Sequence, residues 1–189
     1  MKLLIKTALL FGVLFLTSST CLAQFTADML NTENGVTKTS KLSVLDPYYR
    51  MDMEENGEDI FVIVDQETKV TRVFRPAEKM YMEMGSSGMM SQMNDVFQSI
   101  NNLKETSEPT LVGTETINGY ECEKYNVIRE GKTILTYWQS PTIKFPLKVV
   151  NQMGDETTME LKNIKEGDVD KSLFQIPDGY QKMQMPGMK

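Results

Sequence analysis

The sequence contains no histidine and only two cysteines, Cys21 and Cys122. Histidine is the side chain that most often serves as a general base or a metal ligand near neutral pH, so those roles have no usual donor here. The chain also lacks a Gly-x-Ser-x-Gly nucleophile elbow and a glycine-rich phosphate loop. We therefore expect a protein that is not an enzyme and that needs no cofactor.

Cysteine is equally scarce in the part of the chain that we expect to fold. Cys21 falls in an N-terminal stretch predicted to be removed, which leaves Cys122 without a partner for an internal disulfide. A catalytic cysteine needs an activating base, and no histidine is present to supply one. We therefore expect Cys122 to be a small buried hydrophobic side chain.

The one long apolar run lies at the N-terminus. Lys2 and Lys6 flank the start of an apolar segment from Ala8 to Leu16, and Cys21-Leu22-Ala23 follows with small residues at both specificity positions of a signal peptidase. This segment is too short for a stable membrane span. The pattern predicts a signal peptide over residues 1–23 and a periplasmic or secreted protein. An uncleaved anchor and lipidation at Cys21 are the alternatives.

Positive charge is in deficit, with 20 basic against 26 acidic side chains and a net charge of −6. Removal of Lys2 and Lys6 with the signal peptide would make the chain more acidic still. An acidic surface argues against binding to nucleic acid and against docking on anionic lipid headgroups. Residues 24–189 show no repeat and no low-complexity linker, so we expect one domain there.

Most of this region alternates apolar and polar residues with period two, which is typical of strands. Asn56-Gly57 and Asn118-Gly119 predict hairpin turns because both residue types tolerate positive φ. Pro146 lacks a ladder donor, so its strand should have an edge or a bulge there. The pattern predicts one antiparallel sheet of about ten strands, with eleven strand-like stretches at 25–30, 39–46, 48–55, 59–65, 69–76, 79–84, 110–117, 120–130, 133–140, 143–150 and 156–164.

One segment has a helical period instead. Over residues 86–105, apolar side chains recur at three- and four-residue steps, with Phe97 among them, and polar residues fall between. We expect one amphipathic helix that covers the apolar face of the sheet. A second, short helical turn is expected at 168–174, capped by Asp168 or Asp170.

Methionine is abundant where other special residues are scarce. Met80, Met82 and Met84 alternate along one strand, and Met89 and Met93 lie one helical turn apart directly afterwards. Such a cluster can line a ligand cavity, fill an ordinary core or bind Cu(I), because thioethers are both adaptable and soft. The C-terminal stretch MQMPGMK (183–189) is expected to be a frayed tail.

Several stretches resemble a known family. They are YYRMDME, KMYMEM with its helix, NGYECEKYNV, TYWQSPTIKFPLKVV and SLFQIPDGY. The chain resembles the bacterial exported domain of unknown function 4412 family, which is allied to the LolA-like periplasmic lipoprotein carriers. The resemblance implies a curved antiparallel sheet, like an unclosed barrel, with helices on its concave side. In the carriers that cavity receives acyl chains.

Three functions follow as hypotheses. The first is an exported non-catalytic binding protein for a hydrophobic ligand, a lipid or a lipoprotein acyl chain, held between sheet and helix. The second is a structural or interaction module of the cell envelope with a closed core and a protein partner. The third is a Cu(I)-binding protein that uses Met82, Met84, Met89 and Met93. For the first, the predicted cavity wall is Met51, Met82, Met84, Met89, Met93, Phe97 and Trp138.

Overall fold

The computed structural model describes residues 23–85, 97, 100, 103 and 107–183. Its main feature is a single 12-stranded sheet. The strands are β1 (Gln24–Glu33), β2 (Val36–Leu45), β3 (Tyr48–Glu55), β4 (Glu58–Asp65), β5 (Val70–Arg75), β6 (Met80–Gly85), β7 (Thr110–Ile117), β8 (Tyr120–Arg129), β9 (Lys132–Ser140), β10 (Phe145–Asn151), β11 (Thr157–Glu166) and β12 (Gln181–Lys182).

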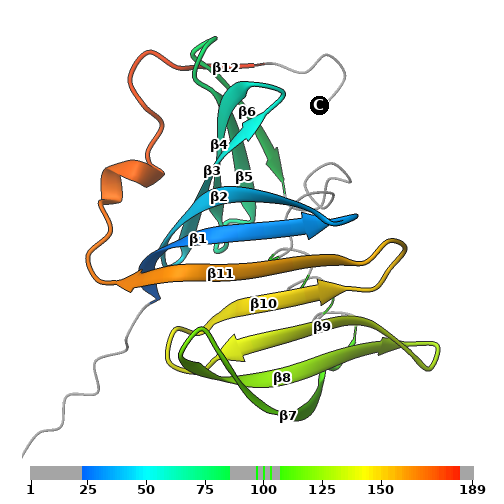
Figure 1. The fold of residues 1–189 in the computed structure, drawn as a ribbon. Coiled ribbons are helices and arrows are strands. Elements are labelled where there is room, and N and C mark those ends of the chain that lie inside the picture. Colours follow the sequence, from blue (N-terminus) through cyan, green and yellow to red (C-terminus); the bar gives the residue numbers. More distant parts are fainter. Residues whose placement is uncertain (1–22, 86–96, 98–99, 101–102, 104–106, 184–189) are drawn as a thin grey trace, which may run out of the picture.

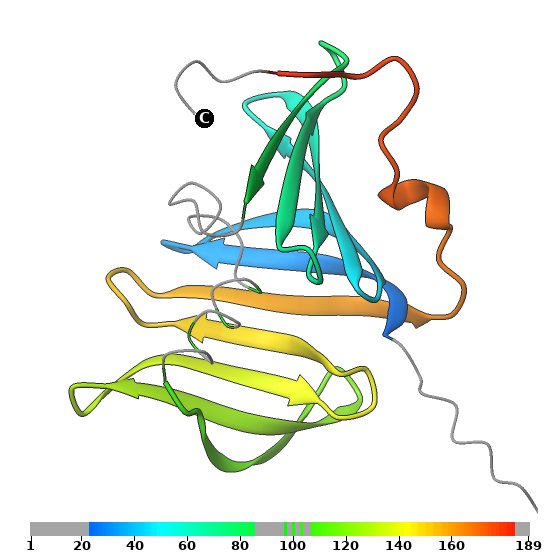
Figure 2. The same ribbon diagram turned by 180° about the vertical axis from the view of Figure 1, so that it is seen from behind.

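The sheet is made of two meanders, β1–β6 and β7–β11, which join where β1 pairs antiparallel with β11. Its order is β12-β6-β5-β4-β3-β2-β1-β11-β10-β9-β8-β7, so β12 and β7 form opposite edges and the sheet is unclosed. β3–β6 run steeply across the direction of β1 and β11 (Figure 1), and the view from behind shows the same bend (Figure 2). This confirms the predicted fold class, an antiparallel, curved and open sheet.

The hairpin turns follow from the local sequence. Asn56-Gly57 and Asn118-Gly119 have positive φ at both residues, as predicted for tight turns between twisted strands. Asn34-Gly35 forms a third turn of this kind, which the prediction of a strand ending at residue 30 missed. The pairing of β10 with β9 shifts register between Pro146 and Lys148, which confirms the expected bulge.

The concave side of the sheet, called here the inner face, holds most of the main hydrophobic core. Phe25, Leu42, Tyr49, Leu147 and Leu161 are all fully or almost fully buried in it. The aromatic rings of Phe25 and Phe145 meet edge to face, with centroids 5.5 Å apart. Alternation along each strand explains this core, because every second side chain points to the same face.

The helix expected over residues 86–105 falls almost wholly outside the described residues, and the described part of the chain delimits no α-helix. Phe97, Ile100 and Leu103 are described; they have helical backbone and are buried in the main core. The Phe97 ring lies 4.5 Å from that of Phe145 and 5.6 Å from that of Tyr49. Among the positions described, no helix is long and apolar enough to cross a membrane.

The opposite side of β3–β6, the outer face, carries a second apolar cluster. Phe61 and Phe74 stack with centroids 4.4 Å apart, and Tyr81 stacks on Phe74 at 5.3 Å. The chain after β11 crosses this face and adds Val169 and Phe174 to the cluster. β4 lies between the two clusters, as its unbroken apolar sequence predicts for a strand covered on both sides.

The segment that covers the outer face contains one short 3₁₀ turn, η1 (Lys171–Phe174). Asp170 caps it by accepting a hydrogen bond from the backbone N–H of Ser172 at 2.9 Å, as predicted. The Arg50 guanidinium stacks on the Phe61 ring at 3.8 Å and donates to the Leu173 carbonyl at 3.0 Å. Arg50 therefore holds this C-terminal segment on the sheet.

Candidate functional site

A row of apolar side chains crosses the inner face from the middle of the sheet to its β6 edge. The strand register sets Leu42 opposite Met51, Met51 opposite Val62, Val62 opposite Val73, and Val73 opposite Met82. Directly paired residues in an antiparallel sheet lie on the same face, with Cβ atoms about 5 Å apart. The five side chains therefore form one continuous apolar stripe.

The exposure of this stripe changes along its length. Leu42 and Met51 are buried, with 0% and 3% of their surface exposed, whereas Val62, Val73 and Met82 are only half-buried. In the parallel row, Tyr49, Val64 and Thr71 are all buried, and only Met84 at its end is half-buried. The inner face is thus a packed core at β2 and β3, and along the Met82 stripe it becomes a partly accessible apolar surface on β4, β5 and β6.

The hairpin end of β3 and β4 extends this accessible surface. Met53 on β3 pairs with Ile60 on β4, and Met80 on β6 pairs with Arg75 on β5. All four positions lie on the inner face. Met53, Ile60 and Met80 are half-buried. We call the half-buried side chains of this region the methionine face, namely Met53, Ile60, Val62, Val73, Met80, Met82 and Met84.

The structure brings four of the seven predicted wall residues to the inner side. Met82 and Met84 lie in the methionine face, while Met51 and Phe97 are buried in the core beside it. Met89 and Met93 lie outside the described residues. Val62 and Val73 were not among the predicted wall residues. Alternation shows that a strand has an apolar face, but it does not show which other strands will lie beside it in the sheet.

Trp138 lies elsewhere. Its strand neighbour Tyr137 occupies the inner face, so alternation places Trp138 on the outer face of β9. The ammonium groups of Lys124 and Lys148 lie 4.8 and 4.9 Å from its ring centroid, and its indole N–H donates to Glu115 at 2.8 Å. That hydrogen bond is the main reason why the pKa of Glu115 is lowered. Trp138 therefore does not share a surface with Met82.

A further methionine joins the inner face from the C-terminus. β12 pairs in parallel with β6, and the backbone N–H of Met183 donates to the Tyr81 carbonyl at 2.7 Å. Met183 is half-buried, and continuing the register of Gln181 with Met80 and Lys182 with Tyr81 sets it opposite Met82. The expectation of a frayed tail is therefore wrong at Met183. No local signal could reveal this, because the pairing joins segments far apart in the sequence.

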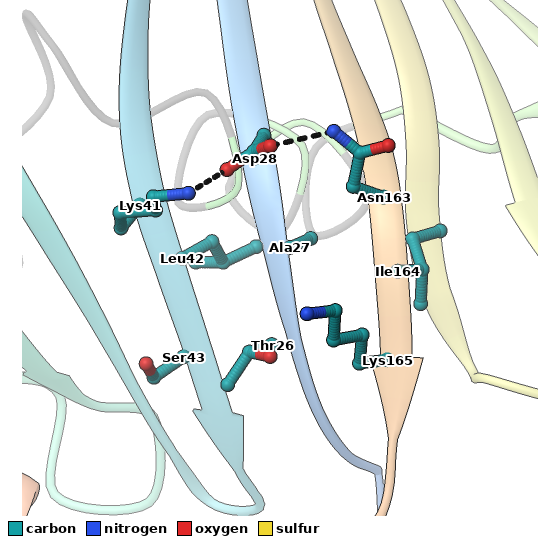
Figure 3. A pocket seen from close by; sticks show the side chains of 9 residues that line it. All are labelled: Thr26, Ala27, Asp28, Lys41, Leu42, Ser43, Asn163, Ile164 and Lys165. Atoms are coloured by element: carbon teal, nitrogen blue, oxygen red, sulfur yellow. Dashed lines mark hydrogen bonds and ion pairs between the residues drawn. The ribbon is translucent and has the colours of Figure 1, made fainter.

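The outer face also has a polar pocket of about 610 Å³ on β1, β2 and β11. Figure 3 shows Asp28 between Lys41 and Asn163 at one end, and Thr26, Ser43 and Lys165 at the other. Asn163 has positive φ at an irregularity in the β1–β11 pairing, and its side-chain amide donates to Asp28 at 2.7 Å.

The carboxylate in this pocket, Asp28, already accepts hydrogen bonds from Asn163 and Lys41. Hydrogen bonds from Asn163 and then from Lys41 lower the pKa of Asp28 below its ordinary value. Asp28 thus stays ionised at neutral pH and has no proton to give. The pocket has the chemistry of a solvated surface groove, and the methionine face is the better candidate for a functional site.

The geometry therefore defines a class of protein: an open, curved antiparallel sheet with a partly accessible apolar inner face and a C-terminal segment across its back. The family model described as "Domain of unknown function (DUF4412)" matches residues 26–144 and 139–180. The chain belongs to this family, as its sequence motifs predicted. No curated protein sequence matches the chain.

Solved structures share the fold at low sequence identity. An uncharacterized conserved protein from Thermus thermophilus matches with a TM-score of 0.57 and 11% identity, over 86% of this chain and 91% of that one. MucB in complex with MucA(peri) matches with a TM-score of 0.51 and 15% identity, over 86% of this chain and 57% of MucB. This chain therefore spans little more than half of MucB. A LolA superfamily protein from Nitrosomonas europaea matches more distantly, with a TM-score of 0.38, 12% identity, and coverage of 80% and 89%.

Proposed function

We propose that this chain is an exported, non-catalytic binding protein that holds a hydrophobic ligand, a lipid or a lipoprotein acyl chain, against the methionine face. The observation that carries the proposal is the change from buried Met51 to half-buried Val62, Val73 and Met82 along one stripe. A contiguous apolar surface that stays accessible to solvent is a binding site by default, since leaving it wet costs free energy.

The residue types of this surface suit a flexible apolar ligand. Methionine is unbranched and polarizable, so its side chain adapts to ligands of different shape. No formally charged side chain lies within the methionine face itself, and exposed Arg75 lies at its border beside Met80. A ligand with an apolar body and an anionic head could place its body on Val62 and Val73 and its head near Arg75.

The titratable groups support a non-catalytic role. Five of the described carboxylates have a pKa that departs from the ordinary value, and in each of them hydrogen bonds or nearby cations lower that pKa. They are Asp28, Asp65, Glu83, Glu115 and Asp170. A general acid at neutral pH needs a raised pKa, so these groups are poorly suited to that task. The signal-peptide pattern of residues 1–23 supports export. MucB, which shares the fold, is described in complex with MucA(peri).

A lipid-binding assay with a charge placed in the stripe tests this function. Val73→Glu puts a carboxylate in the middle of the methionine face, and we expect it to weaken binding of a fluorescent fatty acid at least ~tenfold, because the charge must be desolvated. Val112→Glu is the matched control, since Val112 is 49% exposed on β7 at the opposite edge of the sheet. It should bind like the unchanged protein.

Native mass spectrometry of the protein purified from its own cell envelope gives a second readout. A copurified lipid that is lost in Val73→Glu supports the proposal. If neither method detects an apolar ligand, the second hypothesis replaces it: an envelope interaction module, whose inner face is covered by a protein partner.

A further inference from the structure

The two methionine-rich stretches of the sequence meet at one edge of the sheet. β6 contains Met80, Met82 and Met84, and β12 leads directly into Met183. The backbone N–H groups of Gln181 and Met183 donate to the carbonyls of Lys79 and Tyr81 at 2.9 and 2.7 Å. This parallel ladder places Met183 beside Met82, although the two segments are about a hundred residues apart.

The side chains at this edge are sorted by face. The Lys182 ammonium donates to the Glu83 carboxylate at 2.7 Å, which fixes Lys182 on the outer face with Tyr81 and Glu83. Alternation then puts Met183 on the inner face with Met82 and Met84. The inner positions of β6 and the residues beside it on the C-terminal segment are therefore Met80, Met82, Met84, Gln181 and Met183.

These positions are close enough for their sulfur atoms to share one ligand. Neighbouring strands lie about 4.8 Å apart, and residues two apart on one strand lie about 6.8 Å apart on the same face. A methionine side chain has three rotatable bonds and spans about the same distance. Met82, Met84 and Met183 form such a triangle, and all three are half-buried, so they are shielded yet accessible.

The donor set is unusually uniform. On the neighbouring strands β4 and β5 the same stripe carries the β-branched residues Val62 and Val73, which are the usual choice for a strand. The nearest carboxylate on β6, Glu83, points to the other face and is paired with Arg72 and Lys182. Among the residues that the structure describes, no group of three or more His, Cys, Asp or Glu side chains could hold a metal ion.

A donor set made only of thioethers selects soft ions. Zn²⁺ and Cu²⁺ prefer imidazole, carboxylate or thiolate ligands, whereas Cu(I) accepts neutral sulfur and low coordination numbers. We propose that Met82, Met84 and Met183 form a three-thioether site for Cu(I) at the β6–β12 edge. The site goes beyond the proposed binding of a hydrophobic ligand, because it depends on sulfur and not on apolar area.

Anaerobic titration of the full mature chain with Cu(I), in competition with a chromophoric Cu(I) chelator, tests the site. The unchanged protein should withdraw Cu(I) from the chelator. The triple variant Met82→Leu, Met84→Leu, Met183→Leu keeps the apolar volume and removes the sulfur. We expect its Cu(I) affinity to fall at least ~a hundredfold, because none of the three proposed thioether ligands remains.

A second triple variant controls for methionine content and for folding. Met29→Leu, Met51→Leu and Met159→Leu remove three buried sulfurs of the inner face, each at most 4% exposed, and should leave Cu(I) binding unchanged. Equal Cu(I) binding by the first triple variant, or no withdrawal of Cu(I) by the unchanged protein, overturns the proposal.

Fatty-acid binding by the same variants separates the two proposals. Leucine preserves the apolar surface, so the first triple variant should bind the fluorescent fatty acid as before while it loses Cu(I). Loss of Cu(I) alone therefore supports the metal site independently of the lipid. A protein that binds the fatty acid but never Cu(I) refutes the metal site and leaves the proposed function standing.

Discussion

At the scale of single residues, Cys122 shows how burial determines chemistry. Its side chain is 0% exposed, and burial raises the pKa of its thiol. The thiol donates a long hydrogen bond of 3.5 Å to the Tyr120 carbonyl, and a backbone hydrogen bond with Ile117 also reaches it. The prediction of a small buried hydrophobic residue is confirmed.

We therefore predict that Cys122 reacts slowly with a thiol-specific reagent at a mildly alkaline pH in the folded protein and rapidly in denaturant. Because the folded pKa is raised, the protonated thiol contributes stability that is present below the ordinary pKa of 9.0 and is lost as pH rises through the folded value. Cys122→Ser should lower the free energy of unfolding by about 1–3 kcal/mol, since it replaces a buried thiol with a more strongly hydrated hydroxyl that must be desolvated. Fast labelling under native conditions would show that the site opens.

Trp138 gives a second lesson at this scale. It is the sole tryptophan, and aromatic size alone suggested a place in the core or in a cavity wall. It is buried, with 6% of its surface exposed, and it lies between Lys124 and Lys148 on the paired positions of neighbouring strands, with Glu115 on its indole N–H. Cation–π contacts and one hydrogen bond thus cover a large ring on the outer face.

At the scale of elements, β12 is held to β6 by few interactions. Beyond its backbone hydrogen bonds, Glu83 accepts from Lys182 at 2.7 Å and from Arg72 at 2.9 Å. The hydrogen bond from Lys182 is the largest cause of the lowered pKa of Glu83. The position of Met183 therefore depends partly on one carboxylate.

Replacing that carboxylate should loosen β12. We expect Glu83→Gln to speed exchange of the Met183 amide about two- to fivefold, since a half-exposed ion pair contributes less than about 1 kcal/mol. Glu78→Gln is the control, because Glu78 meets Arg75 only at 3.9 Å in a more exposed pair. Hydrogen exchange with mass spectrometry measures both, and equal rates in the two variants would contradict the role of Glu83.

The same pair sets a pH dependence. The folded pKa of Glu83 lies below the ordinary value of 4.5, so the stabilisation is present above that value and is lost as pH falls through the folded pKa. Loss of the Glu83 charge at acid pH should therefore add to the rate of hydrogen exchange of the Met183 amide in the unchanged protein. The Glu83→Gln variant should lack this added increase.

At the scale of the whole molecule, the two meanders depend on the pairing of β1 with β11. Leu161 lies opposite Met29 at this junction, and their exposed fractions are 0% and 4%. The main core runs without a break from Tyr49 on β3 to Leu135 on β9. We therefore expect the described sheet to unfold as one cooperative unit.

Leu161→Ala tests this unity. We expect it to lower the free energy of unfolding by about 2–5 kcal/mol through the cavity that it creates. Trp138 fluorescence reports β9, and far-ultraviolet circular dichroism reports all strands, so the two signals should give the same midpoint. Leu111→Ala, at a side chain 54% exposed, should have little effect. Separate midpoints would mean that the meanders fold independently.

The features that depend on near neighbours in the chain could be predicted without the structure. Alternation indicated the strands, Asn-Gly pairs indicated the turns at Asn56 and Asn118, and Pro146 indicated a bulge. Alternation also placed Met80, Met82 and Met84 on one face of one strand. These follow from side-chain geometry and from φ preferences, which are properties of a few consecutive residues.

The packing of the whole sheet determined which strand faces became buried core and which became accessible surface. The register of the strands turned Met51, Val62, Val73 and Met82 into one stripe, and the bend of the sheet left one end of it half-buried. The pairing of β12 with β6 brought Met183 to Met82, and the pairing of β9 with β8 and β10 set Trp138 against Lys124 and Lys148 on the other face. Such outcomes depend on contacts between distant segments, whose free energies are summed over the whole sheet and are not visible in any short stretch of sequence.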